Sequence, residues 1–129
     1  MGTLNFDTVR KLGLAFPDVV DGTAYGAPAL KLGGRLLACV PTNKSAEPNS
    51  ILICIDLEQR AELLRQYPVI YYITDHYAAH ATVLVRLSKI TRTDLKELLR
   101  DGCRFVRPLA PKIAITTRRS GDRKGPRRR

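Results

Sequence analysis

A glycine pair, Gly33-Gly34, separates two apolar runs at residues 27–32 and 36–40, and it constrains the fold more than any other feature of the sequence. Glycine adopts positive φ without the steric penalty of a Cβ atom, so a glycine pair between two such runs predicts a β-hairpin. At least part of the domain is therefore expected to be antiparallel β-sheet.

The length of this turn decides which side chains share a face of the sheet. A two-residue turn pairs Leu32 with Arg35 and places Lys31 and Arg35 on opposite faces. A three-residue turn with a glycine bulge pairs Lys31 with Arg35 and leaves apolar side chains on the other face. We favour the three-residue turn because it separates charged from apolar residues, although like charges opposite one another cost stability.

The basic residues are concentrated at the C-terminus. The 129-residue chain has a net charge of +10, yet residues 1–106 hold 13 basic and 11 acidic residues, whereas residues 107–129 hold 9 basic and 1 acidic. A hydrophobic content of 44% suffices for one core. Residues 117–129 contain no apolar side chain to bury. We therefore predict one domain at residues 1–115 and a basic, disordered tail at residues 116–129.

No segment of the sequence approaches the roughly 20 consecutive apolar residues needed to span a bilayer. The N-terminus also lacks the apolar core of a signal peptide. We expect a cytoplasmic protein that makes no membrane contact.

The three cysteines, Cys39, Cys54 and Cys103, are odd in number, far apart and surrounded by apolar residues. This pattern favours buried structural thiols over a disulfide framework or a metal-binding pair. No cofactor is expected.

A first helix is expected before the hairpin. Asn5 or Thr3 can cap its N-terminus, and Pro17 ends it because the residue before a proline disfavours the helical conformation. Its apolar residues recur at three- and four-residue steps, which predicts that they face a sheet: Phe6, Val9, Leu12 and Phe16.

Two further helices follow the hairpin. Asp56 caps one of them, with Gln59 completing a capping box, and Thr91 caps the other, which should end near Gly102. The expected buried positions are Leu57, Ala61 and Leu64 in the first of these helices, and Leu95, Leu98, Leu99 and Gly102 in the second.

The other apolar segments predict strands. The β-branched run at residues 51–55 suits a central strand, and residues 69–73 and 81–87 are also rich in β-forming side chains. Residues 18–22 are expected to form a short acidic turn, and residues 42–50 a mobile loop whose tip can serve as a wing. The predicted fold is α+β, with an antiparallel sheet of about four to six strands and packed helices.

Residues 25–38, YGAPALKLGGRLLA, resemble the (F/Y)-G-x-P-x-F-K-x-x-G-K-x-F-A stretch of the MmcQ/YjbR-like family of small bacterial proteins. The similarity continues through residues 74–77 (TDHY), 83–87 (VLVRL) and 111–112 (PK), and so covers roughly residues 5–115. This resemblance implies a YjbR-like α+β domain with a DNA-binding double-wing arrangement.

Cations on the hairpin and in the tail are the candidate nucleic-acid contacts. Such side chains can follow a phosphate backbone and release its counterions, which makes binding salt-dependent but blind to base sequence. The competing interpretations are ordinary solvated charges and a solubilising tail. The candidates are Lys31, Arg35, Lys44, Arg86, Lys112, Arg118, Arg119, Arg123, Lys124, Arg127, Arg128 and Arg129.

Residues 75–80, DHYAAH, form the other stretch with chemical potential. On a helix, His76 and His80 would share one face and could hold a metal ion with Asp75. The segment lies between two strand-like runs, however, so a loop with a hydrogen-bonding role is the better prediction, and no metal is expected. Candidates for contact with a ligand are Tyr25, His76, Tyr77 and His80.

The sequence contains no phosphate-binding glycine loop, nucleophile elbow or hydrolytic zinc motif, so we predict no enzymatic activity and no catalytic residue. The leading hypothesis is a nucleic-acid-binding protein, with DNA as the expected partner and RNA or an acidic protein as alternatives. A second hypothesis is a protein-interaction or chaperone-like module that binds an acidic partner. A third is a small-molecule-binding protein or enzyme with a site at residues 75–80. A monomer or weak homodimer is expected in each case.

Overall fold

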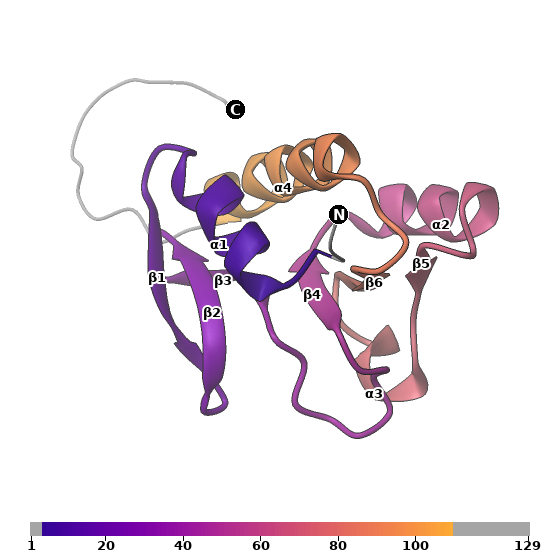
Figure 1. The fold of residues 1–129 in the computed structure, drawn as a ribbon. Helices are drawn as coiled ribbons and strands as arrows, with labels where there is room; N and C mark the ends of the chain where they lie inside the picture. Colours follow the sequence, from indigo (N-terminus) through magenta and orange to yellow (C-terminus); the bar gives the residue numbers. More distant parts are fainter. Residues whose placement is uncertain (1–3, 110–129) are drawn as a thin grey trace.

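The computed structural model describes residues 4–109, which form a single six-stranded antiparallel sheet with the three longer helices packed on one face (Figure 1). The spatial order of the strands is β1-β2-β3-β4-β6-β5. In chain order the elements are α1 (Phe6–Leu14), β1 (Val19–Ala24), β2 (Ala27–Leu32), β3 (Arg35–Cys39), β4 (Ser50–Cys54), α2 (Leu57–Gln66), β5 (Tyr71–Tyr72), α3 (Asp75–Ala78), β6 (Thr82–Arg86), α4 (Arg92–Val106) and the short 3-10 helix η1 (Arg107–Leu109).

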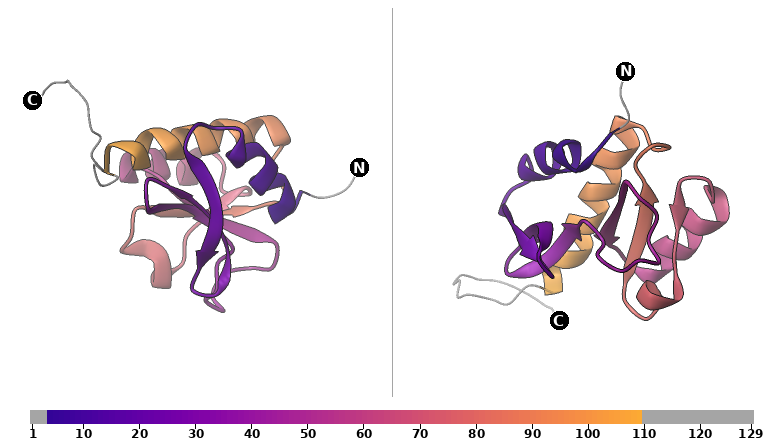
Figure 2. Two further views of the ribbon diagram at one scale, coloured as in Figure 1. Left: turned by 90° about the vertical axis from the view of Figure 1, so that its left-hand side faces the viewer. Right: turned by 60° about the horizontal axis from the view of Figure 1, so that its bottom comes forward.

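The two faces of the sheet are covered differently. Helix α1 packs on β1 and β2, α4 on β3 and β4, and α2 on β5 and β6, which builds the main core on one face. Figure 2 shows α4 running along this side of the sheet. The opposite face carries a small apolar cluster, Ala29, Cys39, Leu52 and Leu84, against which the side chains of Tyr72 and Tyr77 pack. This second face has room for a site.

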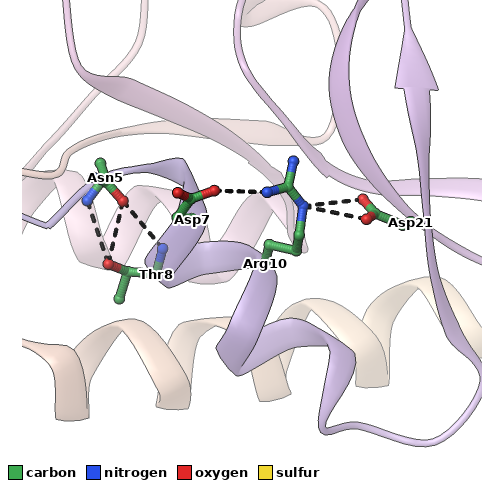
Figure 3. A network of polar contacts seen from close by, with 5 residues as sticks. All are labelled: Asn5, Asp7, Thr8, Arg10 and Asp21. Carbon is green, nitrogen blue, oxygen red and sulfur yellow. Dashed lines mark hydrogen bonds and ion pairs between the residues drawn. The ribbon is translucent and has the colours of Figure 1, made fainter.

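Helix α1 begins where the sequence predicts. The Oδ1 atom of Asn5 accepts a hydrogen bond from the Thr8 amide at 3.2 Å, and the Thr8 hydroxyl accepts one from the Asn5 amide (Figure 3). Arg10 then joins the helix to β1, because its guanidinium contacts Asp7 at 2.6 Å and Asp21 at 3.2 Å.

Helix α2 is also capped as predicted, since Asp56 accepts a hydrogen bond from the Gln59 amide at 3.2 Å. The capping box itself is not formed. The Gln59 side chain instead donates to Asp101 of α4 at 2.6 Å and so ties the two helices together. The expected buried stripe is only partly right: Leu64 packs against the core together with Leu63, whereas Leu57 is 51% exposed and Ala61 is exposed as well.

Helix α4 starts at its predicted cap, with the Thr91 hydroxyl accepting from the Asp94 amide at 3.1 Å. It does not end near Gly102 but continues to Val106. Gly102 serves close packing, because a Cβ atom there would lie 3.0 Å from both the Cys54 carbonyl oxygen and Leu37. The glycine therefore permits contact between helix and sheet and is not a stop signal.

The predicted hairpin is confirmed, but its favoured three-residue turn is wrong. Leu32 pairs with Arg35 around a two-residue turn, in which both glycines have positive φ, 61° and 82°. Lys31 pairs with Leu36, so Lys31 and Arg35 do not share a face.

A β-bulge in β3 then changes the face of the sheet on which the following residues lie. Leu30 pairs with Ala38, which leaves Leu37 as an extra residue in β3. Leu37 and Ala38 both enter the main core as a result. The bulge thus brings two consecutive apolar residues to one core, whereas Lys31 pairs with Leu36 of the second apolar cluster, so the expected separation of charged from apolar side chains is not found.

The expected acidic turn at residues 18–22 is wrong, because β1 begins at Val19 and forms a first hairpin with β2. The turn of this hairpin is Tyr25-Gly26, with φ of 54° and 79°. An outer strand tolerates exposed residues such as Asp21, which explains why its pattern did not look like a strand.

Two other expectations need correction. The strand expected at residues 69–73 is shorter and comprises only Tyr71–Tyr72. The chain before it forms a turn, in which the Tyr67 carbonyl accepts hydrogen bonds from the amides of Ile70 and Tyr71. The polar connection after it contains the four-residue helix α3. Within residues 4–109 we find no helix with the length and apolar character that a membrane crossing requires.

Candidate ligand-binding cleft

A cleft of about 530 Å³ is lined by residues of the small second cluster, such as Leu52 and Tyr77, and by residues on the main-core side, such as Phe105 and Val106. It forms where β3 and β4 separate: these strands pair only through Ala38 with Ile53 and Cys39 with Leu52, so the first half of β3 has no partner in β4. Side chains of β3, β4, the α3 segment and the C-terminal end of α4 line the opening. The cleft is therefore a product of sheet geometry.

One wall of the cleft begins with Pro41 and Thr42 of the β3–β4 connection. Residues 42–50 of this connection, the expected loop whose tip can serve as a wing, are hydrogen-bonded to the α3 and β5 segments. The Asn43 amide donates to the Tyr77 hydroxyl at 3.0 Å, and the Glu47 amide donates to the Tyr72 hydroxyl at 2.7 Å. Lys44 is exposed on this hydrogen-bonded loop.

Arg86 also holds the β3–β4 connection in place, through contacts with Glu47 and with the segment before β5. Its guanidinium makes two 2.8 Å contacts with the Glu47 carboxylate and donates to the carbonyls of Pro68 and Val69, both at 3.1 Å. It also lies 4.4 Å from the centre of the Tyr72 ring. The candidate phosphate contact Arg86 is thus occupied by partners within the domain.

The Glu47–Arg86 pair makes stability depend on pH. The hydrogen bond from Arg86 lowers the pKa of Glu47 below its ordinary value of 4.5. The pair should therefore stabilise the fold fully above pH 4.5, and this contribution should disappear as the pH falls through the lowered pKa. We expect wild type to be more stable than Glu47→Gln at pH 7, with the difference shrinking on acidification towards pH 3.

Chemical denaturation of both proteins at several pH values measures this difference. Glu58→Gln is a suitable control because Glu58 is also exposed, on α2, and forms no ion pair with the residues at positions 4–109. A Glu47→Gln difference that stays constant between pH 7 and pH 3 would contradict the assignment.

The opposite wall is held by a residue that the sequence analysis missed. Arg60 of α2 donates to the carbonyls of His80 at 2.8 Å, Thr82 at 3.0 Å and Ala78 at 3.2 Å. These three acceptors span the connection from α3 to β6, where His80 lies. No local signal marks Arg60, because its partners are backbone atoms distant in sequence.

The four residues expected to contact a ligand all line this one cleft: Tyr25, His76, Tyr77 and His80. The His76 and Tyr77 rings meet edge to face at 4.7 Å. Tyr25 is 87% exposed. Aromatic and imidazole side chains from the β1–β2 turn and from residues 76–80 thus line the same cleft.

Arg35 is the candidate cation that also lines the cleft. It forms no ion pair with any residue in the described part of the chain. Lys31 pairs with Val20 and Leu36 within the sheet and does not line the cleft. The remaining candidates, Lys112 and the tail residues Arg118, Arg119, Arg123, Lys124, Arg127, Arg128 and Arg129, lie outside the described residues.

The thiols of Cys39 and Cys54 also line the cleft, and burial raises the pKa of each to about 11. Both are therefore protonated near neutral pH and are poor nucleophiles. His76 and His80 do not share a helix, because α3 ends at Ala78. Among residues 4–109 no three His, Cys, Asp or Glu side chains are grouped so as to hold a metal ion.

Comparison with known proteins supports the fold. No known family model matches the chain, and no curated protein matches it. Among solved structures, the chain is similar to the Deinococcus radiodurans protein DR2400, which has a DUF419 domain, with 22% sequence identity and a TM-score of 0.65. The match covers 81% of this chain and 79% of that one. This likeness supports the predicted α+β fold.

Proposed function

We propose that this protein binds nucleic acid without catalysing a reaction on it, with the cleft holding part of the strand and the C-terminal arginines adding phosphate contacts. The observation that carries the proposal is the convergence of Tyr25, His76, Tyr77 and an unpaired Arg35, among the described residues, on one cleft. Stacking of a base on an aromatic side chain contributes about 1–3 kcal/mol, and arginine adds attraction to phosphate. The resemblance to the MmcQ/YjbR-like family agrees with a DNA partner, which the cytoplasm would supply.

Reversing the charge at Arg35 tests this function. We expect Arg35→Glu to weaken binding of a fluorescently labelled oligonucleotide about tenfold at low salt, because a carboxylate at the cleft would repel phosphate. Fluorescence anisotropy with single-stranded and duplex DNA measures the affinity. Lys96→Glu makes the same charge change on the exposed surface of α4 and should reduce affinity much less. If wild type binds neither DNA at low salt, the proposal is wrong.

A second candidate function is binding of a small ligand that combines a planar ring with an anionic group. The cleft favours it because Phe105 and Val106 add apolar surface to its lining and its volume lies in the range of about 300–1,000 Å³ that is usual for ligand pockets. A mononucleotide that raises the melting temperature, while oligonucleotides fail to compete with it, would support this function over strand binding.

A further inference from the structure

Tyr25 combines two properties that folding alone does not explain. It occupies the first central position of the β1–β2 turn with φ of 54°, and its side chain is 87% exposed. Bulky residues avoid this left-handed conformation because the Cβ atom crowds the backbone. The other non-glycine residues with positive φ in the described chain are Asp18 and Asn49, which tolerate it well.

The turn itself does not require a tyrosine. Positive φ at both central residues, 54° and 79°, is the pattern of a type I′ turn, for which Asn-Gly is a favoured pair. Asparagine at position 25 would thus fit the backbone better. The ring also buries too little surface to offset the strain. A strained conformation at the edge of a cleft indicates a functional role.

We propose that Tyr25 is a stacking platform for an unpaired base, so that the ligand is a strand with at least one unstacked nucleotide and not a continuous duplex. This inference rests on the proposed nucleic-acid function. Inside a duplex both faces of a base are covered by its neighbours, so the ring of Tyr25 can stack only on a base that has left that arrangement. Arg35 and His76 line the same cleft and would meet the phosphate and the base edge.

The decisive variant is Tyr25→Asn, which should change binding and stability in opposite directions. We expect its affinity for a single-stranded oligonucleotide to fall about tenfold, because one stacking contact is lost. Its affinity for a closed circular duplex, which has no exposed terminal base pair, and for a strand with abasic sites, should change less than twofold. Its melting temperature should rise by roughly 3 °C as the turn relaxes.

Two controls separate stacking from general damage. Tyr25→Phe keeps the ring and should bind single strands like wild type. Tyr67→Asn removes another exposed tyrosine, 51% accessible and outside the cleft, and should leave affinity unchanged.

The outcomes distinguish this inference from the function on which it rests. If Arg35→Glu weakens binding but Tyr25→Asn binds single strands as well as wild type, the stacking role is wrong and the nucleic-acid function stands. A Tyr25→Asn protein that melts below wild type would also overturn the inference, because the turn would then need the tyrosine. If wild type binds no nucleic acid, both proposals fail.

Discussion

Removal of residues 118–129 is expected to weaken nucleic-acid binding by at least tenfold at low salt and to flatten its salt dependence. The removed segment carries seven of the 22 basic residues and one acidic residue. Each phosphate contact that is lost should reduce the slope of log affinity against log salt by about 0.9 on duplex DNA and by about 0.7 on a single strand. The loss should also exceed that of Lys31→Ala, because Lys31 lies within the sheet and outside the cleft.

Salt titrations of the full-length chain, the truncated chain and Lys31→Ala measure these effects. A chain of unchanged length with serine at the seven basic positions is the matched control, because it separates loss of charge from loss of length. It should bind as weakly as the truncated chain. Equal affinity of the truncated and full-length chains would contradict the role of the tail and leave the cleft as the site.

Replacement of Arg86 by leucine is expected to lower the free energy of unfolding by about 2–3 kcal/mol. The guanidinium satisfies two carbonyl groups and one carboxylate, and hydrogen bonds to charged groups contribute about 1.5–3 kcal/mol. Its loss would also release Glu47 and the Tyr72 ring. Urea denaturation measures the change.

The control for Arg86 is Arg100→Leu, which removes an exposed ion pair with Glu97 on the surface of α4 and should lower the free energy of unfolding much less. Arg86→Leu should also weaken ligand binding through the displaced loop. If Arg86→Leu proves as stable as wild type, the guanidinium does not stabilise the β3–β4 connection, and this interpretation of its contacts is wrong.

Helices α1, α2 and α4 were predictable because their start signals are local, whereas the short helix α3, which has no side-chain cap, was not. Asn5, Asp56 and Thr91 each accept a hydrogen bond from the amide three residues ahead, so a short stretch of sequence contains the whole interaction. The end of α4 was not predictable in this way. Gly102 looks like a stop signal until the Cys54 carbonyl is found beside it, and that carbonyl belongs to a distant strand.

The sheet was predictable in class but not in register. A three-residue turn and a two-residue turn followed by a bulge both fit the residues of the hairpin, and the sequence contains no feature that excludes either. The bulge at Leu37 depends on the core that receives it. Strand β1 was missed because an outer strand need not alternate, and because Tyr25-Gly26 lacks the usual composition of a tight turn.

For the candidate site, too, the sequence predicted the residue types but not their arrangement in space. Residue type alone identified Tyr25, Arg35, His76, Tyr77 and His80 as candidates. Their convergence depends on β4 pairing with β6, which brings the α3 segment beside β3, and no spacing in the sequence encodes that arrangement. The sequence did not show that Arg60 and Arg86 hold the walls of the cleft in place. Both side chains donate to backbone carbonyls distant in sequence, and such contacts leave no pattern in the residues.

The strand order also has a consequence for how the chain folds. Strands β1 to β4 pair with their neighbours in sequence, and two of the three connections are two-residue turns, so these contacts form at a small cost in loop-closure entropy. Strand β6 pairs with β4 across α2, β5 and α3 and must bridge a longer stretch of chain. The cleft needs Tyr25 and Arg35 from the first half of the chain and His76 from the second half. It is therefore complete only after β6 has paired with β4, and partly folded chains should be unable to bind.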